Sequence, residues 1–450
     1  MRVQPARRVA YDVLRAVDAD DAYANLLLPV AIGRAGLSPA DAALATELTY
    51  GTLRRRGYYD AVIARAARRE VRRIDPQVLD ALRLSAHQLL STRVASHAAV
   101  NEGVELVRSV SRNAVGFANA VLRAIAREDP GQWRSDVLAG VRDEIERLAL
   151  EHSHPTWIVR AFRRALRAED RADELPALLA ADNAAPAVTM VALPGLAEIP
   201  SGAARTPYSP IGFRLGGGDP ESTVTASGGL VRVQDEGSQL AALALSRAVP
   251  IREGERWLDL CAGPGGKTAV LAAEALAGGA SLEANELVPA RAGLVRRSVE
   301  GVPLAVPVSE ADGRERARKG SGYDRILLDA PCTGLGALRR RPEARWRKQP
   351  GDVPELTAVQ TDLFAAAADG LRPGGLLAYV TCSPHLAETV GVVDEALRVR
   401  DDLETLSAKD VLTDASRSPI DVGGTGPHAQ LWPHRNGTDA MFVSLFRKRA

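Results

Sequence analysis

The chain has 450 residues, with 57 lysines and arginines against 56 aspartates and glutamates, so its formal net charge is +1. Hydrophobic residues make up 46% and charged residues 25%, which is the balance of a globular protein and excludes a disordered or fibrous chain. The length exceeds what one hydrophobic core supports, so two or three domains are expected. The near-neutral total argues only weakly against a nucleic-acid partner, because it can hide a local basic stripe.

Targeting and redox signals are also informative. No run of about 18 uncharged apolar residues occurs, so no membrane span is expected. The first residues alternate charged and apolar side chains, which does not fit a secretory signal and indicates the cytoplasm. The three cysteines are dispersed without a CxxC pair, so neither a disulfide framework nor a metal site is predicted: Cys261, Cys332 and Cys382.

Residues 1–130 are predicted to form an all-α domain. Apolar residues recur at helical spacing in 78–89, 100–107 and 115–125, and no alternating strand pattern interrupts them. Prolines stand at the expected starts or breaks of helices, namely Pro5, Pro29, Pro39 and Pro76. Basic helical faces are expected to supply affinity for the substrate through Arg54, Arg55, Arg56, Arg68, Arg69, Arg72 and Arg73.

Residues 131–228 are predicted to be a small α+β linker domain. A connection around Asp129 is followed by one helix after Pro155, and a short apolar run at Ala187 to Leu193 indicates a strand. The segment ends in a glycine-rich stretch from Gly216 to Gly229 that is expected to be flexible.

Residues 229–450 are predicted to be an α/β domain with a doubly wound, mostly parallel sheet. Apolar runs of strand length end in polar or glycine-rich turns and alternate with amphipathic helical patterns, such as Lys267 to Ala277 and Leu356 to Asp369. The predicted strands are RWLDLCAG, ASLEANE, LAVPVSEAD, YDRILLDAPC and LLAYVTCS. In such sheets ligands bind beyond the carboxyl ends of the strands.

The turn from Cys261 to Thr268, CAGPGGKT, joins a strand to a helix and can bind a polar ligand through its backbone amides. A Walker A motif would need glycine where Cys261 stands, and a GxGxxG fingerprint would need glycine where Thr268 stands. A tight strand-to-helix turn without a ligand is the alternative.

Three acids follow at the ends of successive predicted strands: Glu286, Asp312 and Asp329. Singly, each is more often a solvated strand end or a helix N-cap. Together they indicate a shared ligand, with Glu286 placed for ribose hydroxyls and Asp312 for an adenine amine. A non-P-loop turn beside these acids favours an adenosine ligand without phosphates, such as AdoMet.

Cys332 and Cys382 stand at turns beside prolines at this same edge, where a thiolate can act as a nucleophile. Cys261 is predicted to be a packed thiol. His385, three residues after Cys382, could suggest a Cys–His hydrolase, but no orienting partner is visible. The residues alone do not assign separate roles to the two thiols.

The densest basic segment, Arg339 to Lys348, directly follows the Cys332 turn and contains Trp346. Arginines beside a stacking aromatic fit an RNA backbone and an unstacked base, and a solvated charge run is the alternative.

The chain resembles the bacterial 16S rRNA cytosine-C5 methyltransferases of the RsmB/Sun/Fmu family over almost its whole length. The N-terminal helices resemble a NusB-like RNA-binding domain through ATELTYGTLRRRGYYD from Ala45, SHAAVNEGVELV from Ser96 and GFANAVLR from Gly116. The C-terminal half carries the matching motifs QDEGSQL (Gln234 to Leu240), CAGPGGKT, DAPC to RRRPEARW (Asp329 to Trp346), TCS (Thr381 to Ser383) and WPHRNGTDAMF (Trp432 to Phe442).

The resemblance implies a NusB-like bundle, an α+β linker domain and a Rossmann-like AdoMet-dependent methyltransferase domain. It implies that Cys382 attacks a cytosine of 16S rRNA, that Cys332 assists release of the product and that Asp329 contacts the base. It implies AdoMet binding by Cys261, Ala262, Gly263, Pro264, Gly265, Gly266, Lys267, Glu286, Asp312 and Asp329. The expected partner is 16S rRNA or a small-subunit assembly intermediate, and the enzyme is expected to be a monomer that needs no metal. The alternatives are a tRNA cytosine-C5 methyltransferase and a non-catalytic RNA-binding factor of the NusB kind.

Overall fold

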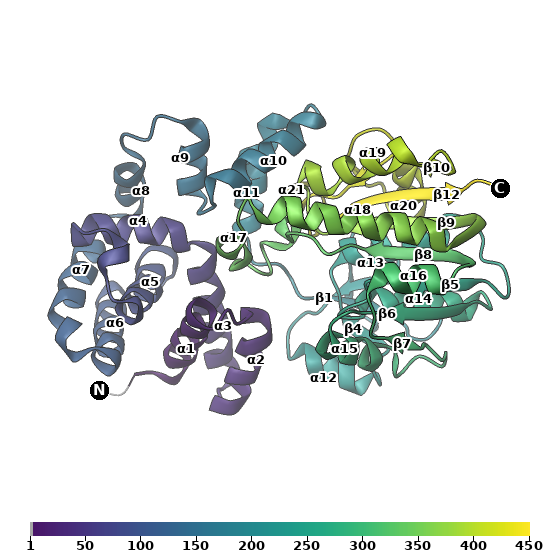
Figure 1. Ribbon diagram of the computed structural model, residues 1–450. Coiled ribbons are helices and arrows are strands. Elements are labelled where there is room, and N and C mark those ends of the chain that lie inside the picture. The colour runs from purple at the N-terminus through teal and green to yellow at the C-terminus, as the bar shows by residue number, and fades with distance from the viewer. Residues whose placement is uncertain (1–2) are drawn as a thin grey trace. The chain divides into compact units, whose positions relative to one another are not determined.

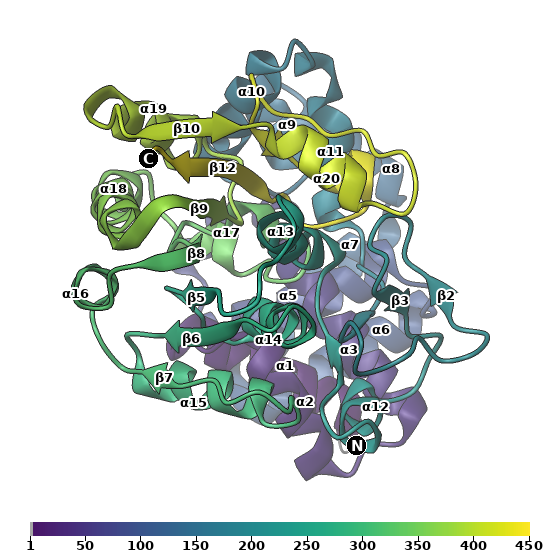
Figure 2. The same cartoon turned by 90° about the vertical axis from the view of Figure 1, so that its right-hand side faces the viewer.

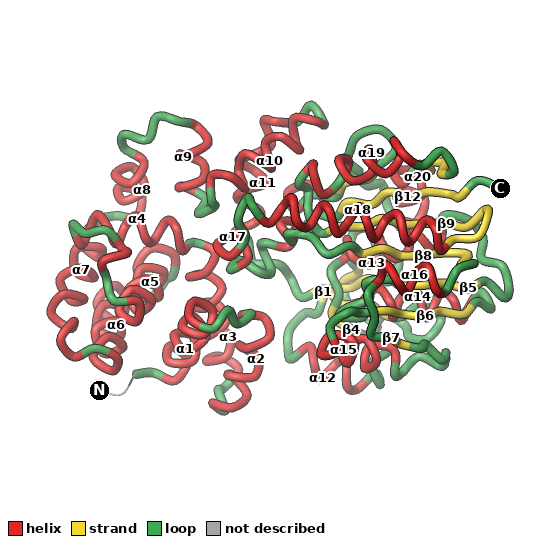
Figure 3. Tube along the Cα trace, viewed as in Figure 1, coloured by secondary structure: helices red, strands yellow, loops and turns green. Residues whose placement is uncertain are grey.

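The computed structural model describes residues 3–450, which form two compact units (Figure 1). The first, called the helical unit, comprises the chain up to Arg160 together with Leu179–Ala184 and Leu338–Arg347. The second, called the sheet unit, comprises Ala161–Leu178, Ala185–Ala337 and Lys348–Ala450. Residues 131–228, predicted as a separate linker domain, are therefore divided between the two units. In Figure 3 strands occur only in the sheet unit.

The helical unit is all-α, as predicted for its N-terminal part. Its longer helices are α1 (Pro5–Ala19), α2 (Ala24–Ala35), α3 (Pro39–Arg54), α4 (Arg56–Ala67), α5 (Pro76–Ser91), α6 (Ser96–Val110), α7 (Val115–Arg127), α8 (Pro130–Leu138) and α9 (Glu144–Glu151). Short helices are η1 (Val71–Arg73), η2 (Arg112–Ala114) and α17 (Ala344–Arg347). Helices α10 (Thr156–Ala168) and α11 (Leu175–Asn183) have residues in both units.

Helix α5 is the core of the helical unit, and every residue from Val78 to Gln88 in it is buried. Neighbouring helices approach it closely through glycines. A Cβ added at Gly51 of α3 would lie 2.2 Å from the His87 ring, and one at Gly103 of α6 would lie 2.3 Å from Ser85 Oγ. The small residues therefore set the spacing of the bundle.

Several helix starts follow from local sequence. Ser38, Asp75 and Asp129 accept hydrogen bonds from first-turn amides, and a proline follows each of them at the start of its helix. Two expectations were wrong. Pro29 lies inside α2, and the connection expected after Asp129 is helix α8.

The sheet unit contains a small antiparallel sheet of order β2-β3-β1-β4. Its strands are β1 (Thr189–Ala192), β2 (Ala204–Arg205), β3 (Gly212–Arg214) and β4 (Val231–Val233). Strand β1 coincides with the predicted apolar run. The stretch Gly216 to Gly229, expected to be flexible, instead contains helix α12 (Pro220–Ala226), which Asp219 caps by accepting a hydrogen bond from Glu221 N.

The main sheet has the order β10-β12-β9-β8-β5-β6-β7 and confirms the predicted α/β fold. Its parallel strands are β5 (Arg256–Asp259), β6 (Ser281–Asn285), β7 (Val308–Ser309), β8 (Tyr323–Asp329) and β9 (Leu371–Thr381). Three strands that the sequence did not reveal lie at the far edge: β10 (Leu403–Leu406), β11 (Ala429–Gln430) and β12 (Phe442–Lys448). Strand β12 pairs antiparallel with β9, and β10 and β11 each pair antiparallel with β12.

Helices cover both faces of this sheet (Figure 2). One face carries α13 (Glu236–Arg247), α14 (Gly266–Ala277), α15 (Pro289–Val299) and α20 (Ala408–Ala415), and the other carries α16 (Gly313–Lys319), α18 (Asp352–Gly370) and α19 (Val390–Val399). Short helices η3 (Ala172–Glu174), η4 (Leu335–Ala337), η5 (Leu386–Glu388) and α21 (Pro433–Asn436) complete the unit. Between residues 3 and 450 no helix is long and apolar enough to cross a membrane.

Candidate active site

The parallel pairing of β8 and β9 brings the two predicted active thiols together. Asp329, the last residue of β8, is in register with Val380 of β9. Because the strands run side by side, the turns that follow them meet, and Cys332 Sγ lies 3.5 Å from Cys382 Sγ. Both side chains are partly exposed. The pair is therefore placed to contact one substrate group at the carboxyl edge of the sheet.

Lys267, at the start of α14, adds a positive charge to this edge. Its Nζ lies 2.8 Å from Asp329 Oδ2, and the ammonium also interacts electrostatically with Cys382. Burial acts to lower the pKa of Lys267, but Asp329, Cys382 and Asp259 together outweigh it and raise that pKa. A cation beside Cys382 favours its thiolate, which is the reactive form.

Cys332 has the opposite electrostatic environment. Its hydrogen bond with Cys382, its burial and the nearby Glu388 carboxylate together raise the pKa of the Cys332 thiol well above its usual value. Lys267 thus places a positive charge near Cys382, and Glu388 places a negative charge near Cys332.

Glu388 is fully buried and connects the two thiol-bearing turns. Its Oε1 accepts hydrogen bonds from Thr333 N at 2.7 Å and from Gln360 Nε2 at 3.3 Å. Its Oε2 accepts hydrogen bonds from Thr333 Oγ1 at 2.5 Å and from Ser383 Oγ at 2.6 Å. Thr333 directly follows Cys332 and Ser383 directly follows Cys382, so one carboxylate fixes both turns.

In the glycine-rich turn, two glycines allow the backbone to lie close to neighbouring side chains. Gly265 adopts a left-handed φ of 104° at the start of α14, and a Cβ there would lie 2.0 Å from Ser298 Oγ. Gly263 N donates a 3.0 Å hydrogen bond to Glu286 Oε2, and a Cβ on Gly263 would clash with that carboxylate. Glu286 is buried and directly follows β6, so the predicted acid and the predicted turn lie together.

Asp259, the last residue of β5, was not singled out from the sequence. It is buried, and Thr268 Oγ1 donates a 2.7 Å hydrogen bond to its Oδ2. Within residues 3–450, its Oδ1 is buried without a hydrogen-bond partner. Burial raises the pKa of Asp259 to about 7. An unpartnered carboxylate oxygen beneath the turn fits a ligand that carries positive charge, as AdoMet does.

Asp312 and Cys261 have simpler local roles. Asp312 is the N-cap of α16, accepting a hydrogen bond from Arg314 N, and its carboxylate also forms a 2.6 Å ion pair with the Arg314 side chain. The Arg314 hydrogen bonds lower the pKa of Asp312. Burial raises the pKa of the Cys261 thiol, so Cys261 is a packed thiol, as its position in the turn suggests.

The basic segment, which was expected to bind RNA, is partly packed within the helical unit, although Arg341 is exposed. Leu338–Arg347 belongs to the helical unit, and Arg345 in it is fully buried. The Arg345 guanidinium donates to the backbone oxygens of Arg54 and Ser153 at 3.0 Å, and to Asn183 Oδ1 at 2.9 Å. Arg347 donates to backbone oxygens at the end of α1 and just after it. Arg345 and Arg347 therefore stabilise the helical unit.

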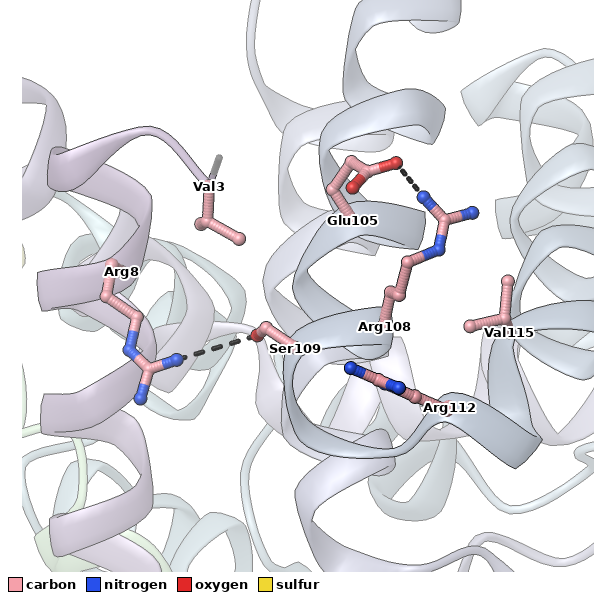
Figure 4. A pocket seen from close by; sticks show the side chains of 7 residues that line it. All are labelled: Val3, Arg8, Glu105, Arg108, Ser109, Arg112 and Val115. Carbon is pink, nitrogen blue, oxygen red and sulfur yellow. Dashed lines mark hydrogen bonds and ion pairs between the residues drawn. The ribbon is translucent and has the colours of Figure 1, made fainter. Parts of the chain in front are cut away.

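The predicted basic face of the helical unit is exposed only in part, at Arg68, Arg69, Arg72 and Arg73. Arg54 is buried and donates to the Arg339 backbone oxygen, and Arg56 pairs with Asp18 at 2.6 Å. A different basic feature lies near the N-terminal end of α1. It is a hollow of about 810 Å³ lined by Val3, Arg8, Glu105, Arg108, Ser109, Arg112 and Val115 (Figure 4).

Three of these side chains are exposed arginines from different elements: Arg8 from α1, Arg108 from α6 and Arg112 from η2. Glu105 pairs with Arg108, and Arg8 reaches Ser109 Oγ at 3.5 Å (Figure 4). Arg8 also pairs with Asp12 at 2.9 Å. In the described part of the chain Arg112 has no ion pair. The hollow therefore carries net positive charge.

Comparison with known proteins identifies the family. Residues 247–447 match the family described as 16S rRNA methyltransferase RsmB/F, and residues 4–127 match the NusB family. The ribosomal RNA small subunit methyltransferase B of Pseudomonas putida is 32% identical over 99% of this chain and 98% of its own length. The chain belongs to the RsmB/F family of 16S rRNA methyltransferases.

Two further comparisons agree. A Mycobacterium tuberculosis protein whose name describes it as a methyltransferase is 49% identical over 455 residues, covering 99% of this chain and 97% of that protein. The crystal structure of the protein PH0851 has the same fold, with a TM-score of 0.80 over 100% of both chains at 22% identity. The expected RsmB-type catalytic domain and NusB-like domain are both confirmed.

RsmB/F proteins are AdoMet-dependent rRNA methyltransferases, so the clustered residues are candidates for one methyltransferase active site. Predicted site residues that the structure brings together at one edge are Gly263, Lys267, Glu286, Asp329, Cys332 and Cys382. Sequence reasoning did not assign Asp259 or Glu388 to the site, because the first lies within an apolar strand and the second is a single acid in the short helix η5.

Proposed function

We propose that this RsmB/F protein transfers a methyl group from AdoMet to carbon 5 of a cytosine in 16S rRNA, through a covalent bond between Cys382 and the base. The observation that carries the proposal is the 3.5 Å pair of thiols, with Lys267 and Asp329 beside it at the sheet edge. An enzyme whose cysteine only attacks the base would need one thiol. In the proposed reaction one thiol attacks the base and a second assists the elimination step, which explains a pair.

The chemistry explains why a thiol is needed. Carbon 5 of cytosine is too poor a nucleophile to take a methyl group directly. The Cys382 thiolate adds to carbon 6, so that an S–C6 bond forms and electron density moves to carbon 5, which can then attack the methyl group. Loss of the carbon 5 proton to a base and breakage of the S–C6 bond release the methylated base and the Cys382 thiolate.

The neighbouring groups have matching roles. Lys267 stabilises the Cys382 thiolate before attack. Asp329, a quarter exposed and held by Lys267, is placed to interact with the base edge and stabilise charge at ring nitrogen 3. Cys332, which keeps its proton, assists the elimination that frees Cys382.

AdoMet supplies the electrophilic methyl group. The residues that would hold it are the turn from Cys261 to Lys267 with Glu286, Asp312 and Asp329, and we add Asp259. The close approach of Gly263 to Glu286 and the unpartnered Asp259 Oδ1 support this assignment.

The helical unit supplies affinity for RNA. Phosphates bind guanidinium groups strongly, and the hollow around Arg8, Arg108 and Arg112 offers three of them without a matching number of acids. The match to NusB over residues 4–127 supports the same role.

Bisulfite sequencing of small-subunit rRNA from a strain that lacks this gene tests the proposal. We expect one cytosine that is protected in the parent strain to become convertible, and protection to return with the wild-type gene but not with Cys382→Ala. Loss of a modification in tRNA, with 16S rRNA unchanged, would contradict the proposed substrate.

A further inference from the structure

We propose that Glu388 is a positioning residue that holds the Cys332 turn against the Cys382 turn and so sets the spacing at which the two thiols share one base. The inference rests on the proposed two-thiol reaction and concerns a residue outside the motifs that define the site. Glu388 does not touch the sulfur atoms, and it acts through Thr333 and Ser383.

The hydrogen bonds show why a carboxylate is needed here. Thr333 donates through both its amide and its hydroxyl, and Ser383 donates through its hydroxyl, so three of the four bonds tie the residues that follow the thiols. Only an ionised carboxylate can accept all of them, because it has two acceptor oxygens and no proton. Thr333 Oγ1 and Ser383 Oγ are themselves only 3.2 Å apart.

The carboxylate is in turn fixed from the other side. Gln360 of α18 donates to Glu388 Oε1 at 3.3 Å and to the Pro331 backbone oxygen at 2.8 Å, just before Cys332. The Tyr379 hydroxyl donates to the Glu388 backbone oxygen at 2.8 Å. Glu388 is thus connected to β9, to α18 and to both turns, and a change in its position moves both thiols.

Glu388 also places a negative charge near the Cys332 thiol. All four hydrogen-bond donors to its carboxylate are neutral groups, and among residues 3–450 it forms no ion pair. Its charge acts on Cys332, whereas Lys267 acts on Cys382. A neutral amide in its place would keep the shape and remove this difference.

Thiol alkylation separates the positioning role from simple stability and needs neither RNA nor AdoMet. Wild type, Glu388→Gln and the control Glu395→Gln are treated with iodoacetamide between pH 7 and pH 9, and each cysteine is followed by mass spectrometry. Glu395 is matched in charge and lies exposed on α19 in the same unit, paired with Arg398. We expect Cys382 to react faster than Cys332 in wild type, and Glu388→Gln to narrow that ratio at least fivefold.

Steady-state kinetics provide the second readout. Glu388→Gln should lower kcat at least tenfold and change the KM for AdoMet less than twofold, because the cofactor-binding residues are unchanged. A ratio of thiol reactivities and a kcat both within twofold of wild type would overturn the proposal. If wild type itself transfers no methyl group, the proposed function fails, but the alkylation result still decides the role of Glu388.

A double variant tests the same spacing of the thiols in case Glu388→Gln does not fold. Thr333→Val with Ser383→Ala removes both hydroxyl donors and keeps the carboxylate. The spacing is measured as the rate at which diamide, a thiol oxidant that takes up the two electrons and two protons, joins Cys332 to Cys382. We expect at least a fivefold slower reaction than in Glu395→Gln, and an unchanged rate would also overturn the proposal.

Discussion

Thr268 donates a hydrogen bond to one oxygen of the Asp259 carboxylate at 2.7 Å and leaves the other oxygen without a partner among the described residues. This arrangement holds a buried acid below the glycine-rich turn in a state that is close to half protonated at neutral pH, since burial raises its pKa to about 7.

The first prediction is that AdoMet binding strengthens as pH rises. Below pH 7 Asp259 is mostly protonated and neutral, and a cationic ligand favours its ionised form, so binding must release a proton there. The Kd should fall between pH 6 and pH 8, by at most about tenfold per pH unit below the pKa. Calorimetric titration across this range measures it, and the slope should disappear in Asp259→Asn. A slope that persists in that variant would assign the proton to another group.

The second prediction concerns Glu286. Its carboxylate holds Gly263 N and Val288 N, both at 3.0 Å. Glu286→Ala should weaken AdoMet binding by roughly 1–3 kcal/mol, because it leaves buried polar groups unpaired. Glu315→Gln on the exposed face of α16 is the control and should leave the Kd unchanged. Equal affinity in wild type and Glu286→Ala would remove Glu286 from the proposed cofactor site.

The third prediction separates the two thiols. Cys382→Ala should give neither methylation nor a covalent RNA complex. Cys332→Ala should attack the base, transfer the methyl group and then stall with Cys382 bonded to carbon 6. The product is a protein–RNA adduct that survives denaturing electrophoresis, carries a labelled methyl group from AdoMet and disappears in the double variant. Accumulation of the adduct in Cys382→Ala would reverse the two roles.

The fourth prediction tests the hollow of the helical unit. Arg8→Ala together with Arg112→Ala should weaken RNA binding and reduce the slope of log K against log salt by about 0.7–0.9 for each phosphate that the variant no longer binds. AdoMet affinity should not change. Arg398→Ala, an exposed arginine on α19, is the control. A slope equal to that of wild type would show that RNA does not bind at this hollow.

The fifth prediction concerns stability. Arg345→Ala removes a buried guanidinium and leaves acceptors such as the Ser153 backbone oxygen unpaired, so the free energy of unfolding should fall by roughly 2–5 kcal/mol. Arg341→Ala in the same segment removes an exposed arginine and should change the free energy of unfolding by less than about 0.5 kcal/mol. Urea denaturation measures both. Similar losses in the two variants would contradict the structural role of Arg345.

The sequence could predict the main sheet and its functional edge because both depend on simple patterns. Apolar strands that end in polar turns indicate a parallel sheet, and parallel strands bring their carboxyl ends to one edge. Asp329, Cys332 and Cys382 could therefore be expected to meet, as the register of β8 and β9 confirms. Strand β12 was not predicted because it joins this sheet only through long-range antiparallel pairing with β9.

Other features depend on tertiary interactions that no local pattern encodes. Asp259 is one polar residue within an apolar strand. Glu388 is a single acid in the short helix η5, and two of its partners, Thr333 and Gln360, are distant in the sequence. For Arg345 a local pattern exists but is misleading. A run of arginines usually indicates an exposed surface, but here residues far away in the sequence supply buried acceptors for it.

The division of the helical unit into three pieces has a consequence for biosynthesis. A ribosome releases the first 160 residues long before Leu338–Arg347 is made, yet Arg345 and Arg347 of that late segment fill acceptors in the early helices. The N-terminal bundle must therefore wait in an incomplete form, with these backbone oxygens open to water, until most of the polypeptide has been synthesised.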